Sequence, residues 1–62
     1  MPIVHIEMWP GRTQSQKAEL ARVLTEAMVT IAHTQAEEVI VVFQEVAKED
    51  WAKAGRLASE AG

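Results

Sequence analysis

The feature that most constrains the fold is an uninterrupted run of five apolar residues at positions 39–43, of which four are β-branched. Unbroken runs of this kind are typical of strands covered on both faces, as in parallel sheets. A first strand is predicted over Ile3–Trp9, because Val4, Ile6 and Met8 alternate onto one wholly apolar face. Ile3, His5, Glu7 and Trp9 share the other face. The sequence therefore predicts two strands, and the second should have other parts of the protein packed against both of its faces.

A helix of about 20 residues is predicted between the two strands. Pro10-Gly11 marks a turn, and residues 13–16 (Thr-Gln-Ser-Gln) have the Thr-x-x-Gln form of a capping box, which makes Thr13 the expected N-cap. The helix should run to about Ala32. Its apolar half is expected to be Leu20, Ala21, Val23, Leu24, Ala27, Met28, Ile31 and Ala32. Strand, helix and strand together predict a right-handed βαβ unit with two parallel strands.

The tail, residues 47–62, is weakly patterned and could form a short hairpin or an arm lying on a neighbouring chain. Two strands and one helix cannot cover both faces of their own sheet, so the open face and the edges should pair with another chain. The shortness of the chain points the same way. Ordering 62 residues costs about 90 kcal/mol, and with no cysteine there can be no disulfide to help. We therefore expect a single domain, residues 1–62, in a homo-oligomer.

Charge and hydropathy exclude several classes of function. Six Lys and Arg stand against nine Asp and Glu, and a formal net charge of −3 argues against binding to a nucleic-acid backbone. No apolar run approaches the roughly 20 residues of a membrane span. The N-terminus lacks the basic stretch and apolar core of a secretory signal. These patterns favour a soluble, cytoplasmic protein.

Pro2 is the most unusual candidate for chemistry. A small second residue normally allows the initiator methionine to be removed, which would leave proline as the N-terminus. The free prolyl nitrogen is a secondary amine, and both desolvation and a nearby cation would lower its pKa toward neutrality. A base in that range suits general-base catalysis. The residue itself leaves a purely structural role open, because proline commonly opens a strand.

Three further residues could form a binding site. Arg12, between Gly11 and the helix N-cap, can bind a carboxylate in a bidentate fork, or can simply be a solvated turn residue. Trp9 and Trp51 could line an apolar pocket or pack between subunits. His5 and Glu7 are too few for a metal site, and no phosphate loop or nucleophile motif is present.

Taken together, these residues resemble the 4-oxalocrotonate tautomerase family (2-hydroxymuconate tautomerase-like) over essentially the whole chain. The resemblance is carried by the segments at 1–3, 11–13, 16–17, 41–43 and 55–59. It implies an α+β fold, a βαβ subunit with a short C-terminal hairpin (tautomerase/MIF-like fold), assembled as a homohexamer from three dimers. It also implies keto–enol tautomerisation of a small 2-oxo acid, with no cofactor and no metal.

The resemblance also implies roles for individual residues. Pro2, after removal of Met1, matches the catalytic proline and would move a proton between the enol and a distal carbon. Arg12 matches the arginine that binds the substrate carboxylate remote from the enol. Trp51 stands where the family usually has phenylalanine, and Trp9 at another pocket-lining position.

One departure concerns charge. The best-studied members carry a second arginine early in the second strand, where this chain has Ile40. That arginine polarises the substrate carbonyl, and stabilising a developing enolate is often the largest catalytic term. Lys53 and Arg56 in the tail are candidates for the missing charge.

Two other functions remain open at the level of sequence. One is a non-catalytic βαβ assembly or binding module, which Ile40 favours. The other is a hydratase- or dehalogenase-type reaction of a small unsaturated acid, in which a cationic proline would act as an acid and His5 or Glu38 would activate water.

Overall fold

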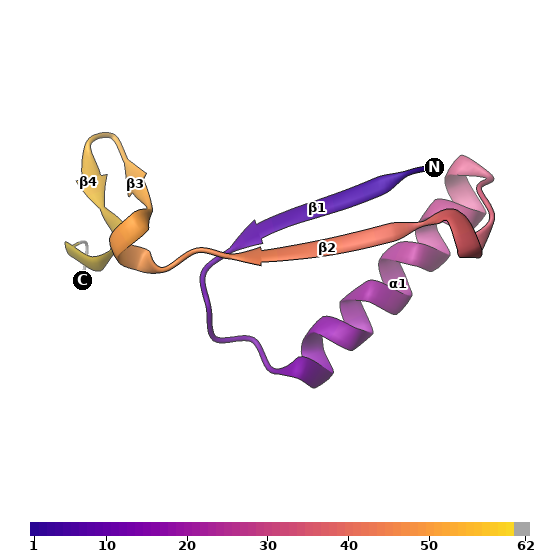
Figure 1. The fold of residues 1–62 in the computed structure, drawn as a ribbon, viewed down its shortest axis with the longest axis horizontal. Helices are drawn as coiled ribbons and strands as arrows, with labels where there is room; N and C mark the ends of the chain where they lie inside the picture. The colour runs from indigo at the N-terminus through magenta and orange to yellow at the C-terminus, as the bar shows by residue number, and fades with distance from the viewer. Residues whose placement is uncertain (61–62) are drawn as a thin grey trace.

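The computed structural model describes residues 1–60, which form a parallel strand pair, one long helix and a small hairpin. The N-terminus and the hairpin lie at opposite ends of a molecule that extends 42 Å along its longest axis (Figure 1). The helices and strands are β1 Ile3–Met8, α1 Gln14–Ala32, β2 Ile40–Glu45, β3 Ala52–Lys53 and β4 Arg56–Leu57. Three short 3-10 helices also occur, η1 Ala36–Glu38, η2 Lys48–Asp50 and η3 Ala58–Glu60.

The two long strands pair in parallel, which confirms the predicted βαβ unit. Their register runs from Ile3 opposite Ile40 to Met8 opposite Glu45. Backbone bonds extend the pairing at both ends, since the Ile40 N–H donates to the Pro2 carbonyl (3.0 Å) and the Val46 N–H to that of Met8 (2.8 Å). Strand β2 therefore begins one residue later than the apolar run and ends two residues beyond it, because its partner strand determines where it pairs.

Helix α1 begins as the capping box predicts. The Gln16 N–H donates to Thr13 Oγ1 (3.1 Å), and the Thr13 N–H donates to Gln16 Oε1 (2.9 Å). Two of the helix's unpaired N–H groups are satisfied in this way. The helix ends at Ala32 because His33 adopts a left-handed conformation with φ 60°. The expected N-cap and C-terminal limit are both confirmed.

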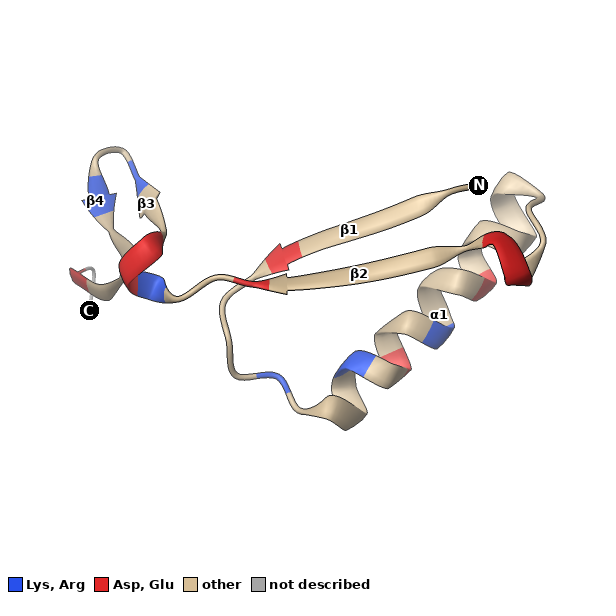
Figure 2. Ribbon diagram, in the orientation of Figure 1, with Lys and Arg blue, Asp and Glu red and all other residues tan. Residues whose placement is uncertain are grey.

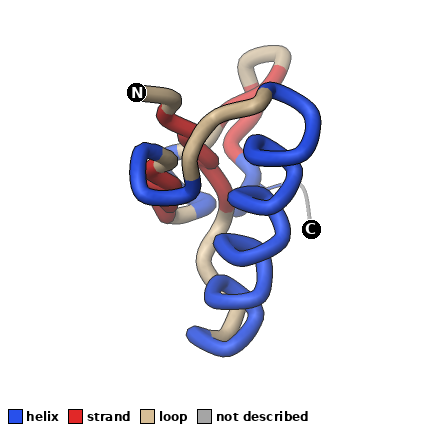
Figure 3. The backbone as a smooth tube through the Cα atoms, turned by 90° about the vertical axis from the view of Figure 1, so that its right-hand side faces the viewer, coloured by secondary structure: helices blue, strands red, loops and turns tan. Residues whose placement is uncertain are grey.

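The helix covers one face of the strand pair, as the end-on view shows (Figure 3). Val4, Ile6 and Met8 are half-buried on that face, as expected. The half-buried positions of the helix are Lys17, Ala21, Leu24, Thr25, Ala27 and Met28. Leu20, Val23 and Ile31 stay exposed, so part of the predicted apolar face has no partner within the chain.

The opposite face of the sheet is not covered by this chain. It carries Ile3, Ile40 and Val42, whose exposed fractions are 60%, 39% and 39%. His5 Nε2 and Gln44 Oε1 form a hydrogen bond of 3.0 Å on the same face. Within residues 1–60 no side chain is fully buried, so one chain alone has an incomplete core. This agrees with the expectation that the chain associates with others.

The tail is a hairpin, one of the two alternatives that its sequence allowed. Strands β3 and β4 are antiparallel and are joined by Ala54 and Gly55, both with positive φ (54° and 80°). Two positive φ values in a two-residue loop are the feature of a type I′ turn. Across residues 1–60, no helix combines the length and apolar character that crossing a membrane requires.

Candidate active site

The candidate catalytic residue, Pro2, stands at the open end of β1. Its carbonyl is held by the Ile40 N–H, and the residue is half-buried, whereas Met1 is 81% exposed. Ile40, the position of the missing family arginine, therefore lies beside Pro2. Ile40 pairs with Ile3, so the surroundings of Pro2 in this chain include two aliphatic side chains.

The two tryptophans meet at the other end of the chain. The centroids of the Trp9 and Trp51 rings are 6.0 Å apart with an interplanar angle of 77°, an edge-to-face contact. Trp9 follows β1 directly, and Trp51 precedes β3. The two rings lie 42 residues apart in sequence, so this contact fixes the tail against the end of the sheet.

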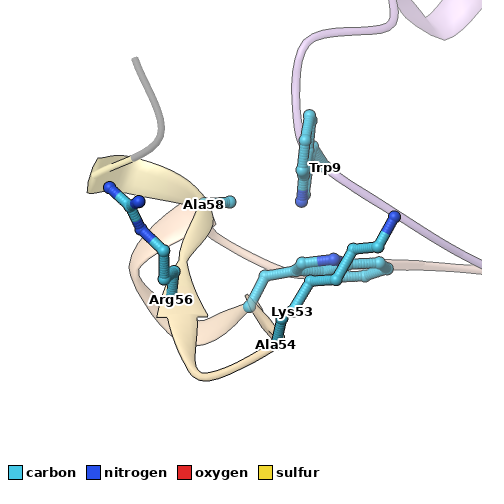
Figure 4. A pocket seen from close by; sticks show the side chains of 6 residues that line it. Trp9, Lys53, Ala54, Arg56 and Ala58 are labelled. Carbon is cyan, nitrogen blue, oxygen red and sulfur yellow. The ribbon is translucent and has the colours of Figure 1, made fainter.

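The tryptophan pair lines a cavity of about 390 Å³, which we call the tryptophan pocket. That volume lies within the range of small-molecule sites. Figure 4 shows Trp9 entering from the sheet side, whereas the other labelled lining residues belong to the tail. The full lining is Trp9, Trp51, Lys53, Ala54, Arg56 and Ala58. The pocket thus combines an aromatic wall with two cations.

A third cation stands near this pocket. Lys48 Nζ lies 4.9 Å from the centroid of the Trp9 ring, which is cation–π distance. The pattern of the sequence does not identify Lys48, because the contact depends on how the fold brings the start of η2 close to Trp9. Blue segments mark the basic residues of this end of the molecule in Figure 2.

Arg12 lies in a separate hollow. It lines a shallow pocket with Ser15, Gln16, Glu19 and Leu20 at the start of α1, and this pocket shares no lining residue with the tryptophan pocket. Of the four predicted site residues, the single chain therefore brings together Trp9 and Trp51 only. Pro2 and Trp9 are separated by the whole of β1, about 23 Å at strand spacing.

Metal ligands are a separate question. Among the residues that the structure describes, no group of three or more His, Cys, Asp or Glu side chains is placed to hold a metal ion. The groups that the chain does offer for chemistry are cations at Arg12, Lys53 and Arg56, an aromatic wall, and, once Met1 is removed, an amine at Pro2. Such groups suit the binding of a small planar acid and the transfer of a proton.

A parallel strand pair headed by proline, backed by one helix and extended by a small hairpin, defines the tautomerase class of small α+β proteins. The chain belongs to the tautomerase family, since the family model described as tautomerase enzyme matches residues 2–61. It is 39% identical over 62 residues to a 2-hydroxymuconate tautomerase of Pseudomonas putida, with 100% of this chain and 98% of that protein covered.

Solved structures agree with this assignment. A homologue of 4-oxalocrotonate tautomerase superposes with a TM-score of 0.91 at 34% identity, covering 95% of this chain and 97% of that one. A heterohexamer 4-oxalocrotonate tautomerase from Chloroflexus aurantiacus gives a TM-score of 0.88 at 37% identity, with 97% of each chain covered. The family resemblance and the fold read from the sequence are confirmed, and the class of chemistry is tautomerisation, an isomerase reaction.

Proposed function

We propose that this protein is a cofactor-independent tautomerase that interconverts the enol and keto forms of a small 2-oxo acid, with Pro2 as the general base. The observation that carries the proposal is that the family match begins at residue 2, so Pro2 heads the matched domain. The small side chain of Pro2 also supports it, because a small second residue normally allows the initiator methionine to be removed. With Met1 attached, the Pro2 nitrogen is a tertiary amide and has no basic lone pair.

The chemistry requires one mobile proton. The Pro2 amine takes the proton from the enol hydroxyl, the electron pair moves through the conjugated chain, and the ammonium returns the proton to a carbon of that chain. An O–H bond breaks and a C–H bond forms, so the product is an isomer of the substrate. In this proposal Arg12 binds a substrate carboxylate, and Trp9 and Trp51 exclude water.

We further propose that the complete site forms between chains, in a homohexamer. One small substrate cannot touch both Pro2 and the tryptophan pocket of the same chain, because the length of β1 separates them. The uncovered sheet face supports association, and a relative of closely similar fold is described as a heterohexamer. Six chains of 6.9 kDa give an assembly of about 41 kDa.

The test compares two forms of the chain that differ only at the N-terminus, one beginning at Pro2 and one retaining Met1, as verified by intact mass. Conversion of 2-hydroxymuconate and of an aryl enolpyruvate is followed by ultraviolet absorbance. We expect the form beginning at Pro2 to be faster by roughly 10²- to 10⁴-fold, the usual contribution of a general base. Its activity should rise with pH through a single ionisation, since only the free amine accepts the proton.

The matched control is Pro2→Ala with Met1 removed, which keeps a primary amine at the same place and should retain partial activity. Equal rates for the capped and uncapped chains would show that Pro2 is not the base. No turnover of either substrate by an assembled, uncapped chain would favour the non-catalytic binding module.

A further inference from the structure

The hairpin places two positive charges directly opposite each other. Lys53 and Arg56 are register partners across β3 and β4, so their side chains leave the same face of the hairpin about 5 Å apart. Like charges at such a cross-strand pair destabilise the hairpin. Two of the six basic residues of the chain thus face each other at a position where their repulsion lowers the stability of the hairpin. A functional role for the pair would explain this placement.

Within residues 1–60, neither cation forms an ion pair with a carboxylate. The ion pairs within residues 1–60 are Lys17–Glu45, Arg22–Glu19 and Arg22–Glu26, and none of them includes the hairpin. In Figure 4 the charged ends of Lys53 and Arg56 point in different directions. Both side chains are exposed and long enough to turn toward an anion placed between them.

The same two residues line the pocket that holds the tryptophan pair. The site therefore combines a flat aromatic wall with two cations that have no ion-pair partner in the part of the chain that the structure describes. Flat conjugated groups pack well on indole rings, and a guanidinium or ammonium beside them binds a carboxylate. Proteins commonly keep locally destabilising residues at functional sites, so the facing cations of the hairpin indicate a binding role.

We propose that Lys53 and Arg56 form the anion-binding end of the tryptophan pocket, and that the pocket selects planar conjugated carboxylates. This rests on the proposed function, since it names the substrate class of that same site. It also accounts for Ile40, because the cationic contact absent beside Pro2 is supplied by the hairpin, which in the assembly comes from another chain.

The test uses trans-cinnamate, a planar conjugated acid with no enol to tautomerise, and its neutral counterpart cinnamamide. The chain has two tryptophans, so two indole N–H signals in a ¹H–¹⁵N spectrum report on both walls of the pocket. We expect cinnamate to shift both signals. Lys53→Gln and Arg56→Gln should each weaken cinnamate binding by up to about fivefold, and the double variant by about tenfold to twentyfold.

Three controls separate charge from structure. Cinnamamide binding should change by less than about twofold in the same variants. Lys53→Arg and Arg56→Lys should retain cinnamate binding, because they keep the charge. Arg22→Gln removes an equal charge from the exposed helix surface and should leave binding unchanged. The neutral hairpin variants should also be at least as stable as the parent chain, since the repulsion is gone.

The outcomes distinguish this inference from the proposed function. Unchanged cinnamate binding in the Lys53→Gln, Arg56→Gln double variant, or an equal loss for cinnamamide, overturns the inference whatever Pro2 does. Cinnamate binding that depends on the two cations, in a protein whose capped and uncapped forms react equally fast, upholds the pocket and rejects Pro2 as the base.

Discussion

The substitution Val42→Asp tests whether the outer face of the sheet is the interior of the assembly. Val42 lies at the middle of that face, across from His5 and between Ile40 and Gln44. The face exposes the equivalent of about 1.4 whole aliphatic side chains in the single chain, taken from the fractions at Ile3, Ile40 and Val42. Complete burial of one such side chain contributes about 1.5–3 kcal/mol, so burial of the face stabilises each chain by roughly 2–4 kcal/mol.

An aspartate at position 42 reverses that contribution. It removes the apolar area of Val42, about 1 kcal/mol, and adds an unpaired buried charge, which costs about 3–5 kcal/mol. The loss per chain then exceeds what the whole face supplies. Because no side chain of residues 1–60 is fully buried in the single chain, dissociation should also unfold it.

The assay is sedimentation velocity together with far-ultraviolet circular dichroism at about 20 μM. We expect about 41 kDa and full secondary structure for the parent chain, and an unfolded chain of 6.9 kDa for Val42→Asp. Val42→Ala, which removes area without charge, should stay assembled, and Gln14→Asp adds the same charge at the exposed start of α1 and should do no harm. A folded 6.9 kDa chain, or a Val42→Asp protein that assembles as well as Val42→Ala, would refute the reasoning.

Three smaller changes test the local structure by urea unfolding at fixed protein concentration. Thr13→Ala removes the hydrogen bond from the Gln16 N–H to Thr13 Oγ1 and should lower the free energy of unfolding by about 1 kcal/mol per chain. An unchanged urea midpoint would mean that the capping box does not stabilise the helix. Ala54→Gly should raise stability by about 0.5–1 kcal/mol, because a left-handed φ of 54° costs alanine roughly 1–2 kcal/mol and the greater flexibility of glycine in the unfolded chain offsets part of that gain. Gly55→Ala should lower the free energy of unfolding by a similar amount through backbone strain alone, since a Cβ there meets no atom within 4 Å. If Ala54→Gly and Gly55→Ala change stability in the same direction, the explanation by backbone strain is wrong.

The sequence predicts those parts of the fold in which one physical pattern runs over many residues. The capping box fixes the start of α1 at Thr13, and alternation in β1 identifies the face that meets the helix. The apolar run identifies β2, although its ends shift because hydrogen bonds to β1 decide where pairing stops. Strands β3 and β4 have two residues each, too short for any periodicity to appear.

The candidate site was only partly accessible to the same reasoning. Pro2, Arg12, Trp9 and Trp51 stand out as residue types, but nothing in the sequence brings the two indoles within 6.0 Å or places Arg12 in another hollow. Lys53 and Arg56 face each other only because the turn between them has two residues. A turn one residue longer would change their register, so their pairing is a property of the folded hairpin.

The shortness of the chain explains both its incomplete core and the separation of Pro2 from the tryptophan pocket. A chain of 62 residues can build two strands and a helix, which leaves the outer sheet face and half of the helix's apolar stripe exposed. The strand that separates Pro2 from the tryptophan pocket is the same strand whose outer face needs a partner. In the homohexamer that we propose, packing copies together buries that face and lets the pocket of one chain approach the Pro2 of another. On this proposal the assembly that stabilises the fold also completes the site, so a change that weakens the outer face should lower activity even where it touches no site residue.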